Sequence, residues 1–198
     1  MRSVALFRST AFALALAAIV GAATAQDQTQ VVIDRGLTED LPYTAIYPTL
    51  LRSVDDGNPT TILTLQHPGT PLQCDVFAAA GAEAGWTAAA ALDKLDIVGI
   101  EATWTPDFPG FSVASQSIAQ FASGPALLYE GESDDSPLGI PLRIVHAEAV
   151  DAGRTYIIEC LMDRATAEEI RPLVDFVIAN FSTRSDGQSC LDPLDSRG

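Results

Sequence analysis

Basic side chains are scarce in this sequence of 198 residues, which has 11 Lys and Arg against 26 Asp and Glu and a formal net charge of −15. A surface so acidic repels the phosphates of nucleic acid and the headgroups of anionic lipids, which proteins bind through Lys and Arg. The composition therefore excludes a nucleic-acid partner and argues against stable membrane binding. Solubility explains the acidity better than a dedicated cation site does.

Catalytic and metal-binding motifs are missing as well. The chain contains no GxSxG, P-loop, HExxH or glycine-rich dinucleotide motif. The acidic stretch 130–135 lacks the spacing of a calcium loop, and only His67 and His146 offer imidazoles. These absences leave no positive case for a metal, a cofactor or a catalytic centre, although distant residues can still assemble a site in the fold.

The first 25 residues have the features of a cleaved signal peptide. Arg2 and Arg8 precede the apolar run STAFALALAAIVGAA. Ala23-Thr24-Ala25 then has the small-x-small pattern of a signal peptidase site. A membrane anchor is the alternative, but the run is short and a polar stretch, 26–30, follows at once. We therefore expect export and a soluble protein in a Gram-negative periplasm. Cleavage would remove two of the 11 basic residues and none of the 26 acidic ones, giving a net charge of −17.

The rest of the chain suits one domain. We expect a flexible arm over 26–40, a single domain over 41–184 and a C-terminal tail over 185–198, where Gly, Pro and Ser break any periodicity. An alanine-rich helix is predicted over 86–99, with Thr87 as its N-cap and Gly99 at its end. Alternation and turn signals predict strands over 60–67, 72–79, 111–121, 125–132, 141–150 and 154–162.

A second helix closes the domain. Thr166 and Glu169 have the spacing of a capping box. The apolar residues that follow have helical spacing and form one stripe: Ile170, Leu173, Val174, Val177, Ile178 and Phe181. The order β-β-α-β-β-β-β-α, with hairpins between most strands, predicts an α+β domain in which both helices pack on a largely antiparallel sheet of about six strands.

The best-defined unit is the hairpin over 141–162. A three-residue loop, Asp151-Ala152-Gly153, would place Gly153 in the left-handed conformation and pair Glu148 with Tyr156. In that register one face carries Leu142, Ile144, Ile158, Cys160 and Met162.

These elements resemble the PsbP-like fold. The likeness rests on the paired strands, the helix near TAAAALDKLD, the stretch GPALLYEGESDDSPLGIPLRIVHAEAV followed by GRTYIIECL, and the closing EEIRPLVDFVIANFST helix. It covers about residues 60–183, and residues 26–59 show no clear counterpart of the family's first hairpin. The fold occurs in an extrinsic subunit of the oxygen-evolving complex, a Ran-binding nucleotide-release factor and small secreted bacterial proteins. The resemblance implies protein binding or assisted assembly, and it brings no catalytic residues onto this sequence.

The three cysteines, Cys74, Cys160 and Cys190, contain no CxxC pair, which argues against a redox motif or a zinc knuckle. In an oxidising compartment, paired thiols usually form structural disulfides. Cys74 and Cys160 both point to the core side of predicted strands, so a bond between them is our first expectation. It would close a loop of roughly 86 residues, worth about 4 kcal/mol in the chain-entropy model. Pairing through Cys190, free thiols or an intermolecular bond are the alternatives.

A polar cluster near the hairpin turn is a candidate site. His146, Glu148 and Tyr156 share a predicted face, and such a group could perform acid–base catalysis or hold a metal. A rim patch satisfied by its own hydrogen bonds is the alternative.

Aromatic residues also gather in the predicted connection 103–111. Trp104, Phe108 and Phe111 stand there with two prolines, a combination that suits protein or ligand binding if the rings are exposed. Alternatively, the rings fold under the connection as a lid on the core.

These patterns predict an exported, acidic, non-enzymatic module that binds a protein or small ligand in the cell envelope or assists assembly. The alternatives are a small periplasmic, hydrolase-like enzyme using the His146, Glu148 and Tyr156 cluster, and an assembly factor linked to a partner through an unpaired Cys190.

Overall fold

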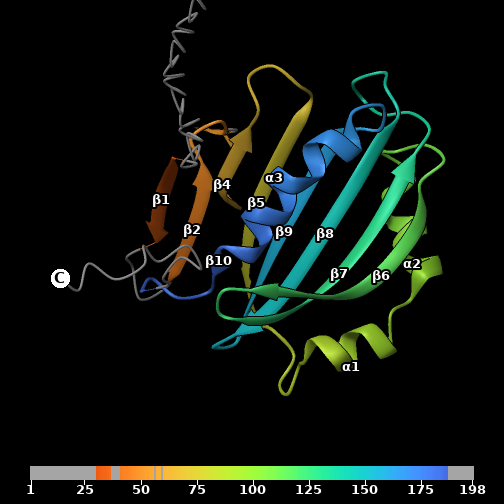
Figure 1. Cartoon of the computed structure of the whole chain (residues 1–198). Helices are drawn as coiled ribbons and strands as arrows, with labels where there is room; N and C mark the ends of the chain where they lie inside the picture. Colours follow the sequence, from red (N-terminus) through yellow and green to blue (C-terminus); the bar gives the residue numbers. More distant parts are fainter. Residues whose placement is uncertain (1–29, 37–40, 56, 59, 187–198) are drawn as a thin grey trace, which may run out of the picture.

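The computed structural model describes residues 30–36, 41–55, 57–58 and 60–186. Within them, ten strands form two antiparallel sheets and three helices pack beside the sheets (Figure 1). The predicted signal peptide, Cys190 and most of the predicted arm and tail lie outside the described residues. No helix in the described ranges is long and apolar enough to cross a membrane.

The larger sheet has seven strands in the order β3-β4-β5-β9-β8-β7-β6, and the smaller has the order β1-β2-β10. The predicted α+β class with a largely antiparallel sheet is confirmed. The strands are β1 (Val31–Gly36), β2 (Tyr43–Pro48), β3 (Arg52–Val54), β4 (Thr61–Gln66), β5 (Leu72–Ala80), β6 (Ser112–Phe121), β7 (Gly124–Ser133), β8 (Leu142–Asp151), β9 (Arg154–Asp163) and β10 (Phe181–Ser182).

Helices cover both faces of the larger sheet. Helix α3 (Ala167–Ala179) lies across one face, here called the core face, together with β2 of the smaller sheet. Helices α1 (Ala88–Asp93) and α2 (Ile97–Trp104) pack against β6 and β7 on the other face, here called the far face. Because side chains alternate along a strand, each strand of the sheet contributes to both layers.

The core face holds the main hydrophobic core. Buried residues of α3, including Ile170, Val174 and Val177, pack there against alternate residues of the strands. Cys74 on β5 stands directly opposite Cys160 on β9, and the two form a disulfide with an S–S distance of 2.05 Å. The structure therefore contains the predicted bond, fully buried in this core.

The N-terminal region departs from the prediction of a loose arm over 26–40. Residues Val31–Gly36 form β1, which pairs with β2 as a hairpin, and β10 pairs with the other edge of β2. The Tyr43 hydroxyl donates to Asp34 across this hairpin at 2.7 Å. The sequence therefore does contain an N-terminal hairpin, where none was apparent from its pattern.

The hairpin of β8 and β9 has a different register from the predicted one. Its turn has two residues, Ala152 and Gly153, with φ angles of 49° and 76°, and Asp151 pairs with Arg154. This loop is one residue shorter than the predicted one, so every pairing between β8 and β9 shifts by one residue. As a result, residues of β8 and β9 that the predicted register placed on the same face lie on opposite faces. Tyr156 consequently faces the core, whereas Ile144 faces the far side, apart from Cys160.

The predicted helix over 86–99 is two short helices. Thr87 caps α1 as expected, its side chain accepting from the Ala90 amide at 3.2 Å. The chain breaks after α1, and Asp96 then caps α2 by accepting from the Gly99 amide at 3.0 Å. Gly99 thus lies in the first turn of α2 and does not end a helix.

The C-terminal helix also differs in detail. Thr166 is the N-cap of α3 but makes no side-chain cap bond, so the predicted capping box is not formed. Phe181 belongs to β10, although its ring is buried in the core that the helical stripe helps to build.

Candidate functional site

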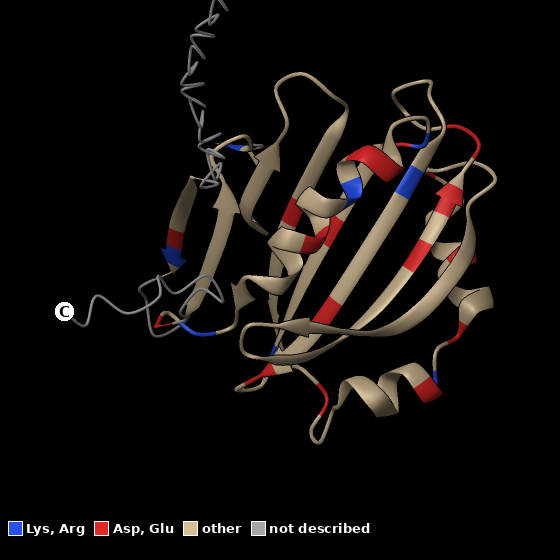
Figure 2. Ribbon diagram, in the orientation of Figure 1, with Lys and Arg blue, Asp and Glu red and all other residues tan. Residues whose placement is uncertain are grey.

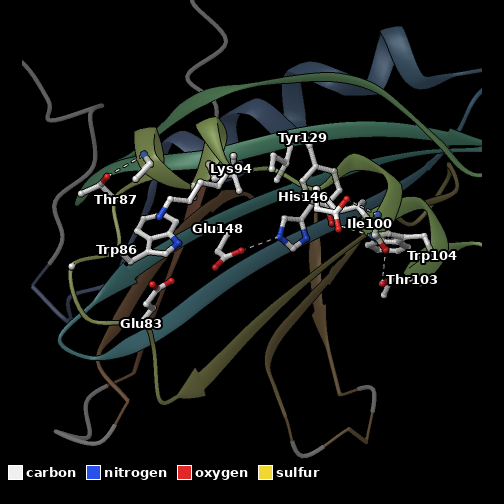
Figure 3. A pocket seen from close by; sticks show the side chains of 17 residues that line it. Glu83, Trp86, Thr87, Lys94, Ile100, Thr103, Trp104, Tyr129, His146 and Glu148 are labelled. Carbon is white, nitrogen blue, oxygen red and sulfur yellow. Dashed lines mark hydrogen bonds and ion pairs between the residues drawn. The ribbon is translucent and has the colours of Figure 1, made fainter.

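A cleft of about 590 Å³ lies between the α1–α2 layer and the far face of β7 and β8 (Figure 3). The strands supply its floor, the helices supply one wall, and the loop before α1 supplies its rim. The lining side chains that carry polar or aromatic groups are Glu83, Trp86, Thr87, Lys94, Asp96, Thr103, Trp104, Tyr129, His146 and Glu148.

Strand register sets the floor. His146 and Glu148 are two residues apart on β8 and so share the far face. Tyr129 on β7 stands opposite His146, and the two rings stack with centroids 4.4 Å apart and planes 13° from parallel. Glu159 on β9 stands opposite His146 on the other side. The imidazole is thereby held between two neighbouring strands.

His146 is buried between two carboxylates. Its Nδ1 lies 3.0 Å from Glu159 Oε1, and its Nε2 lies 3.7 Å from Glu148 Oε2. Burial lowers the pKa of His146, but the hydrogen bonds and negative charges of the two glutamates outweigh burial and raise this pKa above its ordinary value of 6.5. The site therefore favours an imidazolium held by two carboxylates.

The Tyr129 side chain is held by a hydrogen bond from α2. Its hydroxyl accepts a hydrogen bond from Trp104 Nε1 at 3.0 Å. Burial raises the pKa of Tyr129 to about 12, although the bond from Trp104 lowers it. The phenol is therefore neutral at physiological pH, and it serves as part of the cleft floor.

The predicted polar cluster is only partly assembled. His146 and Glu148 do lie together, but Tyr156 faces the opposite side of the sheet, where its hydroxyl donates to the Pro42 carbonyl at 2.7 Å. The prediction that the three share a face is wrong because the turn has two residues instead of three. Sequence reasoning missed Glu159, although its place between Ile157 and Leu161 in the alternation puts it on the far face.

The predicted aromatic segment folds as a lid. Trp104 packs its ring against Phe108 and Phe111, with centroids 5.3 and 5.5 Å away, and Phe111 is only 4% exposed. These rings cover Tyr129 and Ile144 in a second hydrophobic cluster on the far face. Phe111 is therefore unavailable as a binding surface, as the lid alternative predicted.

The rings of Trp104 and Phe108 each line a hollow in the surface. Trp104 lines the cleft described above, and Phe108 lines a second, mostly apolar hollow of about 430 Å³ beside Leu138 and Leu161. A binding role for Trp104 and Phe108 stays a prediction.

The cleft is suited to binding more than to proton transfer. Both ring nitrogens of His146 face carboxylates, so the imidazole has no nitrogen free to take a proton from a substrate. Among the described residues, no group of three His, Cys, Asp or Glu is placed to hold a metal ion. The cleft instead offers aromatic walls and carboxylates. Acidic residues outnumber basic ones in the whole chain, and Figure 2 marks their positions along the ribbon.

Comparison with known proteins identifies the fold. No protein-family model and no curated protein sequence matches the chain. Among solved structures, cyanobacterial PsbP (CyanoP) from Synechocystis sp. PCC 6803 matches with a TM-score of 0.55 and 11% identity, covering 82% of this chain and 98% of that one. The fold is PsbP-like. The resemblance inferred from strand order is thus confirmed at the level of architecture.

Two further solved structures match the chain with lower TM-scores. LpqN of Mycobacterium tuberculosis, involved in cell envelope biogenesis, has a TM-score of 0.47 and 13% identity over 80% of this chain and 86% of its own. The Saccharomyces cerevisiae Ran-binding protein Mog1p has a TM-score of 0.49 and 8% identity over 78% of this chain and 96% of its own. Neither of these two matches assigns a role to any residue of the cleft.

Proposed function

We propose that this chain is an exported, non-enzymatic accessory protein and that the cleft between α1–α2 and the far face is where it binds a partner or a small ligand. The observation that carries this proposal is a preformed hollow whose lining combines apolar, aromatic and charged side chains, the usual make-up of a ligand site. The PsbP-like fold supports a binding role by analogy only.

The side chains on the floor of the cleft are held by contacts with one another, which favours selective binding. The stacking of Tyr129 on His146, the Trp104 bond to Tyr129 and the Glu159 bond to His146 fix these side chains before a ligand arrives. A site organised in advance loses less conformational entropy on binding.

An enzyme is the weaker alternative. The hydrolase-like hypothesis relied on Tyr156, which lies on the core face, and on His146, whose nitrogens both face carboxylates. Tyr129 takes the place of the missing tyrosine beside His146, but its pKa of about 12 makes it a poor base at neutral pH.

Export to a Gram-negative periplasm is part of the proposal. The buried Cys74–Cys160 bond fits an oxidising compartment, as does the predicted signal peptide over residues 1–25. The partner is therefore sought among components of the cell envelope.

Intrinsic fluorescence provides a direct test, because the chain has two tryptophans, Trp86 and Trp104, and both line the cleft. The mature protein would be titrated with the small-molecule and protein fractions of a Gram-negative periplasmic extract. We expect at least one fraction to shift the emission, and single Trp→Phe variants to show which end of the cleft responds.

A matched pair of variants on α1 provides the control. Ala91→Phe fills the cleft, whereas Ala89→Phe adds the same ring at an exposed position that does not line it. The emission shift should disappear in the first variant and persist in the second. An unchanged response in Ala91→Phe, or no response to any fraction in the unmodified protein, would contradict the proposed function.

A further inference from the structure

We infer that the group held in this cleft is an organic cation, an ammonium carried on an aliphatic chain; this rests on the proposed function, since it names the ligand of the same site. A free polyamine and a lysine side chain of a partner share this chemistry. The cleft's charge, its carboxylate oxygens without a partner among the described residues and its aromatic walls each point to it.

The charged groups of the lining are mainly acidic. Glu83, Asp96 and Glu148 line the cleft against a single basic residue, Lys94, which is the chain's one lysine. His146 adds positive charge at the floor, but Glu159 beneath it offsets that charge. A cationic ligand therefore meets an attractive field, and an anion is repelled.

Two of these carboxylates have unused hydrogen-bonding capacity. Glu148 interacts with His146 through Oε2, and among the described residues its other oxygen has no partner. The Glu83 side chain likewise has no hydrogen-bond or ion-pair partner among the described residues. Asp96, in contrast, is engaged as the cap of α2. An ammonium has three donors and no acceptor, so it matches the unbonded carboxylate oxygens of Glu148 and Glu83.

Aromatic rings complete the recognition. Figure 3 shows Trp86 at the same end of the cleft as Glu83, Glu148 and Lys94. The ring of Trp86 is half-buried and so retains an exposed part. Tryptophan is the best aromatic partner for a cation, and a methylene chain packs on the same surface. A ligand with an ammonium head and an aliphatic stem fits both the carboxylates and the rings.

Nα-acetyl-lysine amide is the first probe, and Nα-acetyl-norleucine amide is its neutral near-isostere. Tryptophan emission should report binding of the lysine derivative, and the norleucine derivative should bind roughly tenfold more weakly, as expected for a cation–π contact with charge pairing. Comparing 1,5-diaminopentane with a lysine-containing peptide then distinguishes a free amine from a protein side chain as the source of the ammonium.

Three charge variants sharpen the test. Glu148→Gln should weaken the lysine derivative by about tenfold, and Lys94→Gln should strengthen it, because these changes move the cleft charge in opposite directions. Glu169→Gln removes a carboxylate from the exposed surface of α3, away from the cleft, and should leave the affinity unchanged.

The outcomes separate this inference from the proposed function. Equal binding of the norleucine derivative, binding of glutarate, or an extract fraction that shifts the emission when no amine does would overturn the cation while leaving a binding cleft. If neither amines nor extract fractions shift the emission, both proposals fall. Loss of affinity in Glu148→Gln with a gain in Lys94→Gln supports the organic cation.

Discussion

At the scale of single residues, His146 links stability to pH. It stacks on Tyr129 and contacts Glu148 and Glu159, and Lys94 and Asp96 line the opposite wall of the cleft. Its pKa is raised in the folded protein, so its stabilising contribution is fully present below the unfolded value of 6.5. That contribution is lost as the pH rises through the raised pKa.

Replacing His146 with Gln should therefore flatten the pH dependence of unfolding. The free energy of unfolding in urea, measured from about pH 5.5 to about pH 8.5, should fall toward higher pH more steeply in the unmodified protein than in the variant. His67→Gln, which removes the chain's other imidazole at the β4–β5 turn, is the matched control with which the slope of His146→Gln is compared. Parallel curves for the unmodified protein and His146→Gln would contradict the linkage.

The disulfide is the second residue-scale feature with a measurable consequence. A Cys74→Ala, Cys160→Ala double variant should lose about 4 kcal/mol of stability, because the bond closes a loop of 86 residues. Urea unfolding of the two proteins in a Cys190→Ser background measures this difference free of thiol exchange. Cys190→Ser alone should unfold like the unmodified protein, and a double variant of unchanged stability would show that the bond does not constrain the chain.

At the scale of elements, alternation predicted six of the seven strands in the larger sheet and failed at one turn. Residues such as Leu72, Cys74 and Val76 alternate with polar neighbours, so β5 was visible in the sequence. The β8–β9 turn places Ala152 at a φ of 49°, a conformation uncommon for alanine, and the predicted loop gave it to Gly153 alone. That single misplaced residue moved Tyr156 to the wrong face of the predicted site.

The smaller sheet was not predicted from the sequence, for a different reason. All six residues of Tyr43–Pro48 are buried, since β2 lies between its two partner strands and against α3, so the strand shows no alternation. Its partner β1 has a charged pair, Asp34 and Arg35, within six residues. Such strands are recognised from tertiary contacts, which a single sequence does not reveal.

The break between α1 and α2 depends on Asp96. Its side chain accepts from the Gly99 amide, so Asp96→Ala should destabilise the protein by about 1 kcal/mol and speed hydrogen exchange in α2. Asp93→Ala removes a similar exposed carboxylate that caps nothing, and it controls for charge. Equal effects of the two substitutions would show that the cap contributes nothing to α2.

The lid over the far face depends on the absence of a side chain at Gly131. A Cβ there would lie 2.3 Å from the Phe111 ring, so Gly131→Ala should cost about 1 to 3 kcal/mol and change the emission of Trp104, which packs on Phe111. Thermal unfolding and fluorescence measure the two effects. Phe111→Leu should recover part of the loss in the double variant, and failure of this rescue would place the strain elsewhere.

At the scale of the whole molecule, the site is assembled from segments that no local motif connects. Trp86 comes from the loop before α1, Trp104 from α2, Tyr129 from β7 and His146 from β8. Sequence reasoning found His146 and Trp104 individually, but their neighbours depend on strand register and on the broken helix. Fold class follows from periodicity along the chain, whereas a cleft follows from contacts across it.

Export is the prediction that concerns the entire chain. Expressed with its first 25 residues in a Gram-negative host, the protein should appear in the periplasm with an intact mass beginning at Gln26, one internal disulfide and one free thiol. Ala23→Lys puts a bulky charge where signal peptidase requires a small residue, so that variant should retain Met1. A periplasmic product with three free thiols, or an uncleaved unmodified protein, would refute this assignment, and the cysteines would then be reconsidered as reactive or metal-binding groups.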